Sequence, residues 1–400
     1  MRRVARWVRP VNAMMAPALE RSLRDPDRVF DRMLARAEKA GGATAAIDPA
    51  FIDDSRELLH RFAREETVSY MGWIGTRTEL QMRLENRLRI RRLIAESPEI
   101  TSEPIDRPIV VVGLPRTATT LSHKVFAHPE GNRAPLTWEF QHADRADADP
   151  AERAKHFKRT QRLSNTVKYM LPVWPVIHPS SADTPEECVL ALPHGLHWLT
   201  RFRMPGYREW LADRDFVPDY AYLKQFLQVL QHGDRPRRWV LKSPFHLYNL
   251  DALLKVFPDA AIVWTHRDPQ TVLGSFCSLV ETGMAAANTE YDPARIGEDW
   301  LDILSWMVEQ GRHARTRISP DRLIDVSYHQ LTADPYGQLP GIFERLGLTW
   351  TEREERNLAD VLARPGMRRS HEYSLAYYGL DFDQVDRAFG DYSRMVAAMR

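Results

Sequence analysis

The sequence contains little cysteine, little net charge and no long apolar run. Cys188 and Cys277 are its only cysteines, which argues against a disulfide framework and against a cysteine metal site. The formal charge of +1 excludes the strongly basic surface of a typical nucleic-acid-binding protein. No apolar run reaches about 18 residues, and the arginine-rich N-terminus lacks the apolar segment of a secretory signal. These absences predict a cytoplasmic enzyme with no nucleic-acid partner.

Lysine is also rare, because only eight of the 55 basic residues are lysine. A lysine that directly follows an apolar run is therefore a candidate functional residue, and Lys242 is in this position. The hydrophobic content of 44% is that of a globular chain with a core, and 400 residues suit one large domain or two ordinary ones.

Residues 1–104 carry helical signals. Apolar residues recur at helical spacing over 4–19 with arginines between them, although Pro10 and Pro17 should interrupt a continuous helix. A later helical pattern is expected to end at Ser97-Pro98. Two interpretations of the first stripe stay open. It packs on the chain's own helices, which the prolines favour, or it makes a peripheral contact with a membrane surface.

The pattern changes after Pro104. Short apolar runs now alternate with long helical stretches, and these runs lie at 109–112, 239–241, 261–264 and 323–326. Such alternation predicts βαβ units and a mostly parallel sheet. We therefore expect an α/β fold in which helices flank a parallel sheet over residues 105–400, with residues 1–104 as a helical N-terminal extension.

The first of these runs leads into Gly113-Leu-Pro-Arg-Thr-Ala-Thr-Thr120, a tight turn rich in hydroxyls. A strand, a turn and a helix start in this order form an anion site, because free backbone N–H groups converge there. The pattern is neither G-x-G-x-x-G nor G-x-x-x-x-G-K-[ST], and it offers no Lys-Ser/Thr pair for magnesium. The segment indicates a phosphate-type anion bound without metal, or else an ordinary strand–helix turn capped by threonine.

The run at 261–264 ends in the same way. Arg267 stands at the expected carboxyl end of the strand, where ligands of open α/β sheets collect. Pro269 suits the first turn of a helix that would contain Ser275, eight residues after Arg267. Arginine and serine together suit a phosphate, although Arg267 could instead pair with Asp268.

Together the two segments resemble the sulfotransferases that use 3′-phosphoadenosine 5′-phosphosulfate (PAPS). Pro115-Arg-Thr-Ala-Thr-Thr120 is similar to the family's 5′-phosphosulfate loop, and Arg267 with Ser275 is similar to its 3′-phosphate element. Leu241-Lys-Ser-Pro-Phe-His246 resembles the bacterial and tyrosylprotein-type branch. The resemblance covers about 105–385 and implies a P-loop-type sheet. Ala118 departs from it, because the family usually has glycine there, and a methyl group would crowd the sulfate if φ had to be positive.

The resemblance implies a donor site and a metal-independent, in-line transfer. Arg116 and Lys242 would stabilise the charge that builds on the leaving oxygen. The basic tail at Arg368 and Arg369 would close over the 3′-phosphate, unless it is a solvated turn. The residues implied to bind PAPS are Pro115, Arg116, Thr117, Ala118, Thr119, Thr120, Arg267, Ser275, Tyr328, Arg368 and Arg369.

A hydroxyl acceptor also needs a base. By resemblance to the tyrosylprotein branch, we expect Glu139, which follows His128-Pro129, to take this role in one cleft with Arg116 and Lys242. The segment Asp183-Thr-Pro-Glu-Glu187 offers a competing pair, although Pro185-Glu-Glu187 also suits the first turn of a helix.

The acceptor itself cannot be read from the sequence. Aromatic and apolar residues crowd 169–216, and His194 and His197 lie among them. This cluster fits a hydrophobic hydroxyl acceptor such as a lipid, and equally fits a core or a homodimer interface. Two other functions stay open: a P-loop kinase-like protein, which the missing lysine disfavours, and a PAP-binding protein without activity.

Overall fold

The structure, a computed structural model, describes residues 3–363 and 374–399. These residues contain a five-stranded, all-parallel sheet in the order β2-β3-β1-β4-β5. The strands are β1 (Ile109–Gly113), β2 (Asn132–Arg133), β3 (Arg238–Lys242), β4 (Ala261–His266) and β5 (Leu323–Ser327). Four of them are the strands that the sequence predicts, and β2 is an addition. The predicted α/β class is therefore confirmed.

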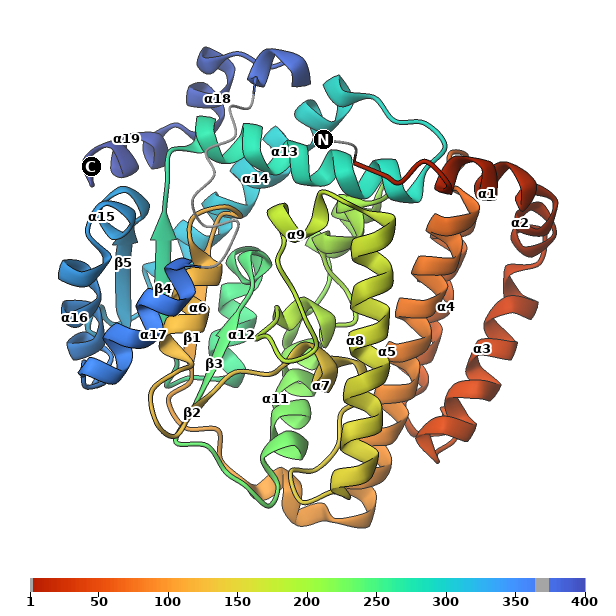
Figure 1. Cartoon of the computed structure of the whole chain (residues 1–400), viewed down its shortest axis with the longest axis horizontal. Helices are drawn as coiled ribbons and strands as arrows, with labels where there is room; N and C mark the ends of the chain where they lie inside the picture. The colour runs from red at the N-terminus through yellow and green to blue at the C-terminus, as the bar shows by residue number, and fades with distance from the viewer. Residues whose placement is uncertain (1–2, 364–373, 400) are drawn as a thin grey trace.

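Helices cover both faces of the sheet and form a separate layer beside it (Figure 1). Before β1 lie α1 (Val8–Met14), α2 (Ala16–Leu23), α3 (Pro26–Gly41), α4 (Pro49–Ala63) and α5 (Tyr70–Glu96). Between β1 and β3 lie α6 (Thr119–Phe126), α7 (Thr137–Gln141), α8 (Pro150–Met170), α9 (Trp174–Ile177), α10 (Tyr207–Ala212) and α11 (Val217–Gln231). Further along the chain come α12 (Leu250–Val256), α13 (Pro269–Ala287), α14 (Pro293–Arg315), α15 (Tyr328–Ala333), α16 (Pro335–Arg345), α17 (Glu352–Ala363), α18 (Phe382–Phe389) and α19 (Asp391–Ala397).

Seven short 3-10 helices complete the described elements. They are η1 (Ala45–Ile47), η2 (Pro98–Ser102), η3 (Cys188–Leu190), η4 (Leu196–Thr200), η5 (Pro244–Asn249), η6 (Pro320–Arg322) and η7 (Leu375–Tyr378).

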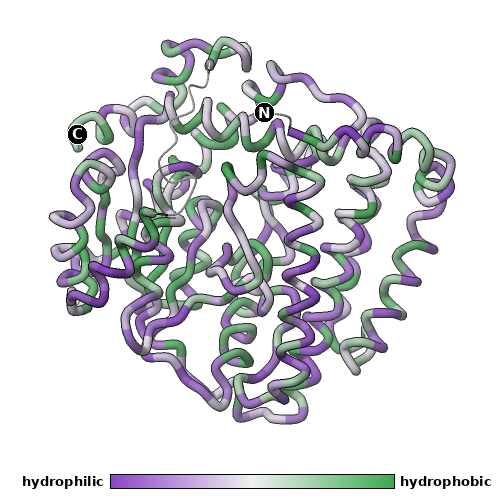
Figure 2. Tube along the Cα trace, viewed as in Figure 1, coloured by the Kyte–Doolittle hydropathy of each residue, from purple (hydrophilic) through white to green (hydrophobic). Residues whose placement is uncertain are grey.

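The sheet separates two hydrophobic clusters because side chains alternate along each strand. Val110 and Val112 of β1 belong to the larger cluster, which extends into the N-terminal helices. Ile109 and Val111 belong to the smaller cluster on the other face, which includes α6, α16 and α17. All five residues of β1 are buried, as expected for a central parallel strand. Figure 2 shows the outer helix α3 alternating between green and purple along its length.

The N-terminal helices pack on the rest of the chain through α5. Val8 and Leu19 of the predicted stripe are buried, and α1 and α2 both contact α5. This packing supports the first interpretation of the stripe. The break between α1 and α2 falls at Met15, whereas Pro10 and Pro17 lie in the first turns of the two helices, where a missing N–H costs no hydrogen bond. No helix in the described part of the chain is long and apolar enough to cross a membrane.

The carboxyl ends of β1, β3 and β4 lie side by side at one edge of the sheet. Gly113 is in register with Thr265, and Lys242 is in register with Val111. Because β1 lies between β3 and β4 although it precedes both in the sequence, the loops after these strands diverge from a common crevice. The sequence motifs lie at this crevice.

Candidate functional site

The loop after β1 has the backbone of an anion-binding turn. Arg116 and Ala118 both have positive φ, at 69° and 70°, and α6 begins directly afterwards at Thr119. The first amides of α6 have no helical carbonyl ahead of them, so their N–H groups are free to meet an anion. Gly113 has φ of 144°, and a Cβ there would lie 2.5 Å from the carbonyl oxygen of Thr265. Only glycine fits at that position.

One predicted ligand of this loop is used within the protein. Thr117 is completely buried, and its Oγ1 donates to the carbonyl oxygen of Leu114 at 2.7 Å and lies 2.6 Å from the Thr265 hydroxyl. Its hydroxyl therefore ties the loop to β4. Thr119 and Thr120 occupy the first turn of α6, next to the free amides.

Ala118 has a positive φ, the conformation in which its methyl group is expected to crowd the sulfate. A left-handed conformation costs an alanine roughly 1 kcal/mol, and a glycine at this position would avoid that cost. Glycine is also more flexible in the unfolded chain, which would cancel part of the gain in stability. We therefore expect Ala118→Gly to raise the free energy of unfolding in urea by about 0.5 kcal/mol. Ala127→Gly is the matched control, because Ala127 ends the same helix with φ of −79° and its replacement should lower stability. A destabilised Ala118→Gly protein would show that the alanine methyl contributes packing that outweighs the strain.

The two predicted anion-binding segments come together in the structure. Arg116 Nε donates to Ser275 Oγ at 3.1 Å, so the loop after β1 is joined to α13. Arg267 Nη1 donates to the carbonyl oxygen of Arg116 at 2.9 Å, and its guanidinium lies 3.9 Å from the ring centre of Tyr328. Pro269 begins α13 as expected, and Asp268 accepts hydrogen bonds from two amides of its first turn.

Lys242 ends β3 and is almost completely buried. Its Nζ donates to Oε1 of Glu187 at 2.6 Å, and 2% of its side chain is exposed. This is an unusual environment for a lysine at a strand end, since an unpaired buried ammonium is costly. The sequence predicted Lys242 as a site residue, but it did not predict Glu187 as its partner.

Glu186, the neighbouring glutamate, has a different partner. Its Oε2 lies 3.2 Å from Nε2 of His178. Burial acts to raise the pKa of Glu186, but the His178 ring and the nearby Lys242 charge outweigh it and lower this pKa to about 2. Arg116 is close as well, because its Nη1 donates to the carbonyl oxygen of Ile177 at 2.8 Å, one residue before His178.

The segment 183–187 is not the first turn of a helix, so that interpretation is wrong. Pro185 instead forms a bridge with Leu136, and the amide of Glu186 donates to the carbonyl oxygen of Pro135. The 3-10 helix η3 begins only at Cys188. The extended backbone before it lets the two glutamates point to different partners.

Glu139 has both carboxylate oxygens engaged. Oε1 pairs with the guanidinium of Arg133, and Oε2 accepts from the backbone amide of Leu136 at 2.8 Å, which caps α7. The side chain is 2% exposed. Within the described ranges no hydrogen bond or ion pair joins Glu139 to Arg116 or Lys242. Its role as the base therefore stays a prediction from the sequence.

The aromatic region 169–216 is mostly core. Trp198, Phe202 and Tyr207 are completely buried, which agrees with the core interpretation of these three rings. His197 is buried beside Arg83, and His194 lies between Asp219 and Asp54. The exposed exception is Tyr169, whose ring stacks on Trp7.

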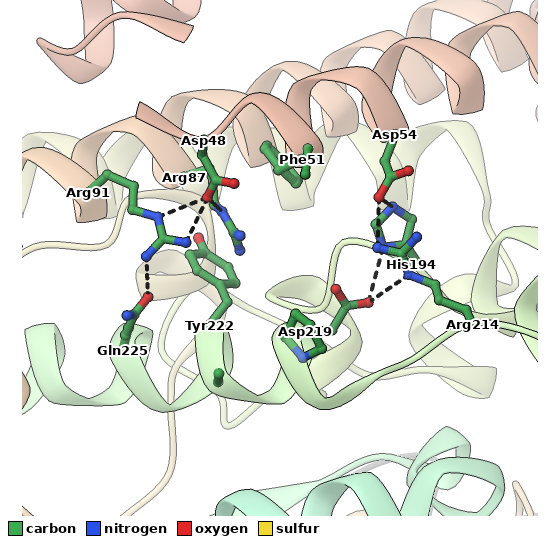
Figure 3. A pocket seen from close by; sticks show the side chains of 13 residues that line it. Asp48, Phe51, Asp54, Arg87, Arg91, His194, Arg214, Asp219, Tyr222 and Gln225 are labelled. Carbon is green, nitrogen blue, oxygen red and sulfur yellow. Dashed lines mark hydrogen bonds and ion pairs between the residues drawn. The ribbon is translucent and has the colours of Figure 1, made fainter. Parts of the chain in front are cut away.

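A cavity of about 250 Å³ lies between the N-terminal helices and α11, and His194 is part of its lining (Figure 3). Asp48 pairs there with Arg87 and Arg91, and Asp54 pairs with Arg214 at 2.7 Å. Its acidic and basic side chains neutralise one another and tie η1 and α4 to α5 and α11. No residue of the predicted donor site lines this cavity.

Two further predictions concern the tail and metals. Arg368 and Arg369 lie outside the described residues. Within the described ranges no group of His, Cys, Asp and Glu side chains is arranged to hold a metal ion.

The sequence of residues 108–352 matches the model of the sulfotransferase family. The chain belongs to this family. Over 290 residues, 68% of this chain and 70% of the relative, it is 25% identical to the omega-hydroxy-beta-dihydromenaquinone-9 sulfotransferase Stf3 of Mycobacterium bovis and of Mycobacterium tuberculosis.

Solved sulfotransferase structures extend the similarity to most of the chain. STF1 from M. tuberculosis H37Rv shares 29% identity and a TM-score of 0.78, over 90% of this chain and 98% of that one. STF9 from Mycobacterium avium shares 26% identity and a TM-score of 0.80, over 91% and 96%. Both similarities cover about nine-tenths of this chain. Together with the family match, they identify it as a sulfotransferase enzyme.

Proposed function

We propose that this sulfotransferase takes its sulfuryl group from PAPS and transfers it to a hydroxyl of a hydrophobic, lipid-like acceptor. The observation that carries the donor assignment is the junction of the two anion-binding segments. Arg116 contacts Ser275, and Arg267 contacts both Arg116 and Tyr328. Two guanidinium groups on two adjoining loops suit a nucleotide with phosphate at both its 3′ and 5′ positions.

Each residue then has a role that its position supports. The amides of the loop, Arg116, Thr119 and Thr120 hold the 5′-phosphosulfate at the start of α6. Arg267, Ser275 and Tyr328 hold the 3′-phosphate. Lys242 faces the bridging oxygen, on which charge accumulates as the S–O bond breaks.

The acceptor class rests on the relatives. The name of the mycobacterial Stf3 proteins describes a hydroxylated dihydromenaquinone as their acceptor, which is a prenyl lipid with a terminal hydroxyl. At 25% identity this supports the same chemical class for the present chain. It does not support the same molecule.

We expect the purified protein to bind PAP at least 30-fold more tightly than ATP, because Arg267 and Ser275 recognise a 3′-phosphate that ATP lacks (about 2 kcal/mol for one charge-assisted contact). Isothermal titration with both nucleotides measures this ratio. Equal affinities would favour a kinase-like protein. Incubation with ³⁵S-labelled PAPS and lipid extracts then separates an active transferase from an inactive PAP-binding protein.

A further inference from the structure

His178 and Glu186 form a hydrogen-bonded pair next to the two cations of the proposed transfer site. The Nε2 atom of His178 lies 3.2 Å from Oε2 of Glu186. Ile177, the residue before His178, accepts a hydrogen bond from Arg116. Lys242 is near enough to lower the pKa of Glu186. The pair is therefore held between the loop after β1 and the end of β3.

In the neutral ring, the carboxylate fixes which nitrogen of His178 carries the proton. An ionised Glu186 can only accept, so Nε2 of the neutral imidazole donates to it and Nδ1 keeps a lone pair. No hydrogen bond or ion pair of Nδ1 is present among the described residues, and 28% of the His178 side chain is exposed. Nδ1 is thus an accessible proton acceptor whose orientation is set by Glu186.

Two other histidines are coupled to the Lys242 charge, and neither is accessible. His123 is completely buried and contacts the carbonyl oxygen of Val240. His246 is also completely buried and contacts the hydroxyl of Tyr220. Burial lowers the pKa of each to about 3. They are neutral core residues.

The carboxylates that compete for this role have other partners. Glu139 is divided between Arg133 and the Leu136 amide, and Glu187 holds Lys242. Each of these carboxylates would have to give up its partner to accept a proton, whereas the neutral ring of His178 accepts one at Nδ1 while Nε2 stays hydrogen-bonded to Glu186. Among the described residues beside Arg116 and Lys242, His178 is the accessible titratable group with this arrangement.

We propose that His178 is the catalytic base of this enzyme and that Glu186 is its positioning residue. The inference rests on the proposed function. In the transfer step the acceptor oxygen forms a new bond to sulfur while the S–O bond to the 5′-phosphate of PAPS breaks. The acceptor proton passes to Nδ1 of His178, and the bridging oxygen leaves with PAP as an anion. The imidazolium then returns the proton to solvent.

The environment of His178 predicts a pH dependence. Burial acts to lower the pKa of the ring, but the carboxylate of Glu186 outweighs it and raises this pKa above its ordinary value. Glu187 adds to the increase and Lys242 opposes it. The neutral ring is the base, so the rate of transfer should rise with pH as His178 loses its proton.

The test compares reactions that need a base with one that does not. Transfer from PAPS to farnesol, a primary prenyl alcohol, and hydrolysis of PAPS by water both remove a proton from a weakly acidic hydroxyl. The reverse transfer from 4-nitrophenyl sulfate to PAP releases a phenolate that is stable without a proton. We expect His178→Gln to slow the first two about 100-fold and to leave the reverse transfer and PAP affinity within about threefold. His313→Gln, on the exposed surface of α14, is the control.

Three results bear on the assignment. Equal loss in all three reactions would overturn it, because His178 would then act through the structure of the site. Normal transfer by His178→Gln, with Glu139→Gln about 100-fold slower, would return the role to Glu139. Glu186→Gln should move the inflection of the pH–rate profile to lower pH, and an unmoved inflection would remove Glu186 from the mechanism. A wild-type protein without forward or reverse transfer would instead refute the proposed function itself.

Discussion

Replacing Lys242 by methionine is expected to lower the rate of sulfuryl transfer about 1,000-fold while PAP affinity changes less than about threefold. The side chain is 2% exposed and ends a strand inside the sheet, so in the proposed role its ammonium acts in a site shielded from water. There a fixed positive charge stabilises the leaving oxygen far more than it would in solution. That charge develops only during transfer, and ground-state binding of PAP should therefore hardly respond.

The Lys242→Met protein needs a control for stability, because it leaves the Glu187 carboxylate without its partner. The double variant Lys242→Met/Glu187→Gln removes both charges and should restore the thermal midpoint without restoring the rate. Lys255→Met changes an exposed lysine on α12 and should behave as the wild type. The rate is measured with labelled PAPS under saturation. Normal turnover by Lys242→Met would make the Lys242–Glu187 pair a purely structural one.

Glu187 compensates the charge of Lys242 within the protein. A buried ammonium without a partner would be costly, and Glu187 supplies the compensating charge at 2.6 Å. An incoming phosphosulfate offers the same ammonium a second anion. Glu187→Gln should therefore remove the ion pair with Lys242 and, unlike Lys242→Met, leave an active enzyme.

The sheet could be predicted from the sequence because its strands are short, buried and bounded by turn residues. The predicted runs at 109–112, 239–241, 261–264 and 323–326 are short and apolar except for Asp325, and each lies within a strand. Arg267 directly follows a parallel strand, so its place at the ligand-binding edge could be predicted from the sequence. The placement of Arg116 and Lys242 in the donor site comes instead from the family resemblance. The strand β2 is only two residues long and carries no such signal.

The partners of the charged groups could not be predicted, because they depend on contacts between loops. His178 meets Glu186 across an irregular segment with no periodicity. Glu139 follows Leu136, which is not a capping residue by type, so its role at the start of α7 has no sequence signature. Pro185-Glu-Glu187 has a helical first-turn composition, but pairing of Pro185 with Leu136 overrides it. In these segments, contacts between loops determine the conformation and the partners of the charged groups, and local sequence propensity does not.

Arg267→Ala is expected to weaken PAP binding about 300-fold, or about 3.4 kcal/mol, because it removes a charge-assisted contact and also leaves the phosphate without its cationic partner. The position supports this role on two sides. One nitrogen of the guanidinium is fixed on the Arg116 carbonyl at 2.9 Å, and its face lies 3.9 Å from the Tyr328 ring centre. A fork held in this way is already oriented, so little rotamer entropy is lost when the 3′-phosphate arrives.

The same contacts also allow Arg267 a structural role, and a comparison of two nucleotides distinguishes this role from phosphate binding. Arg267 supports the loop after β1 through the Arg116 carbonyl, so its loss could also disturb the 5′ end of the nucleotide. Adenosine 5′-phosphate shares that end with PAP and lacks the 3′-phosphate. We expect Arg267→Ala to change its affinity less than about threefold, in contrast to the 300-fold change for PAP. Arg267→Lys keeps the positive charge but loses the planar guanidinium. Its affinity for PAP should lie between those of the wild type and Arg267→Ala, since a lysine makes one contact where arginine makes two. Equal losses for both nucleotides would show that Arg267 acts by holding the loop, and the 3′-phosphate would then belong to other residues.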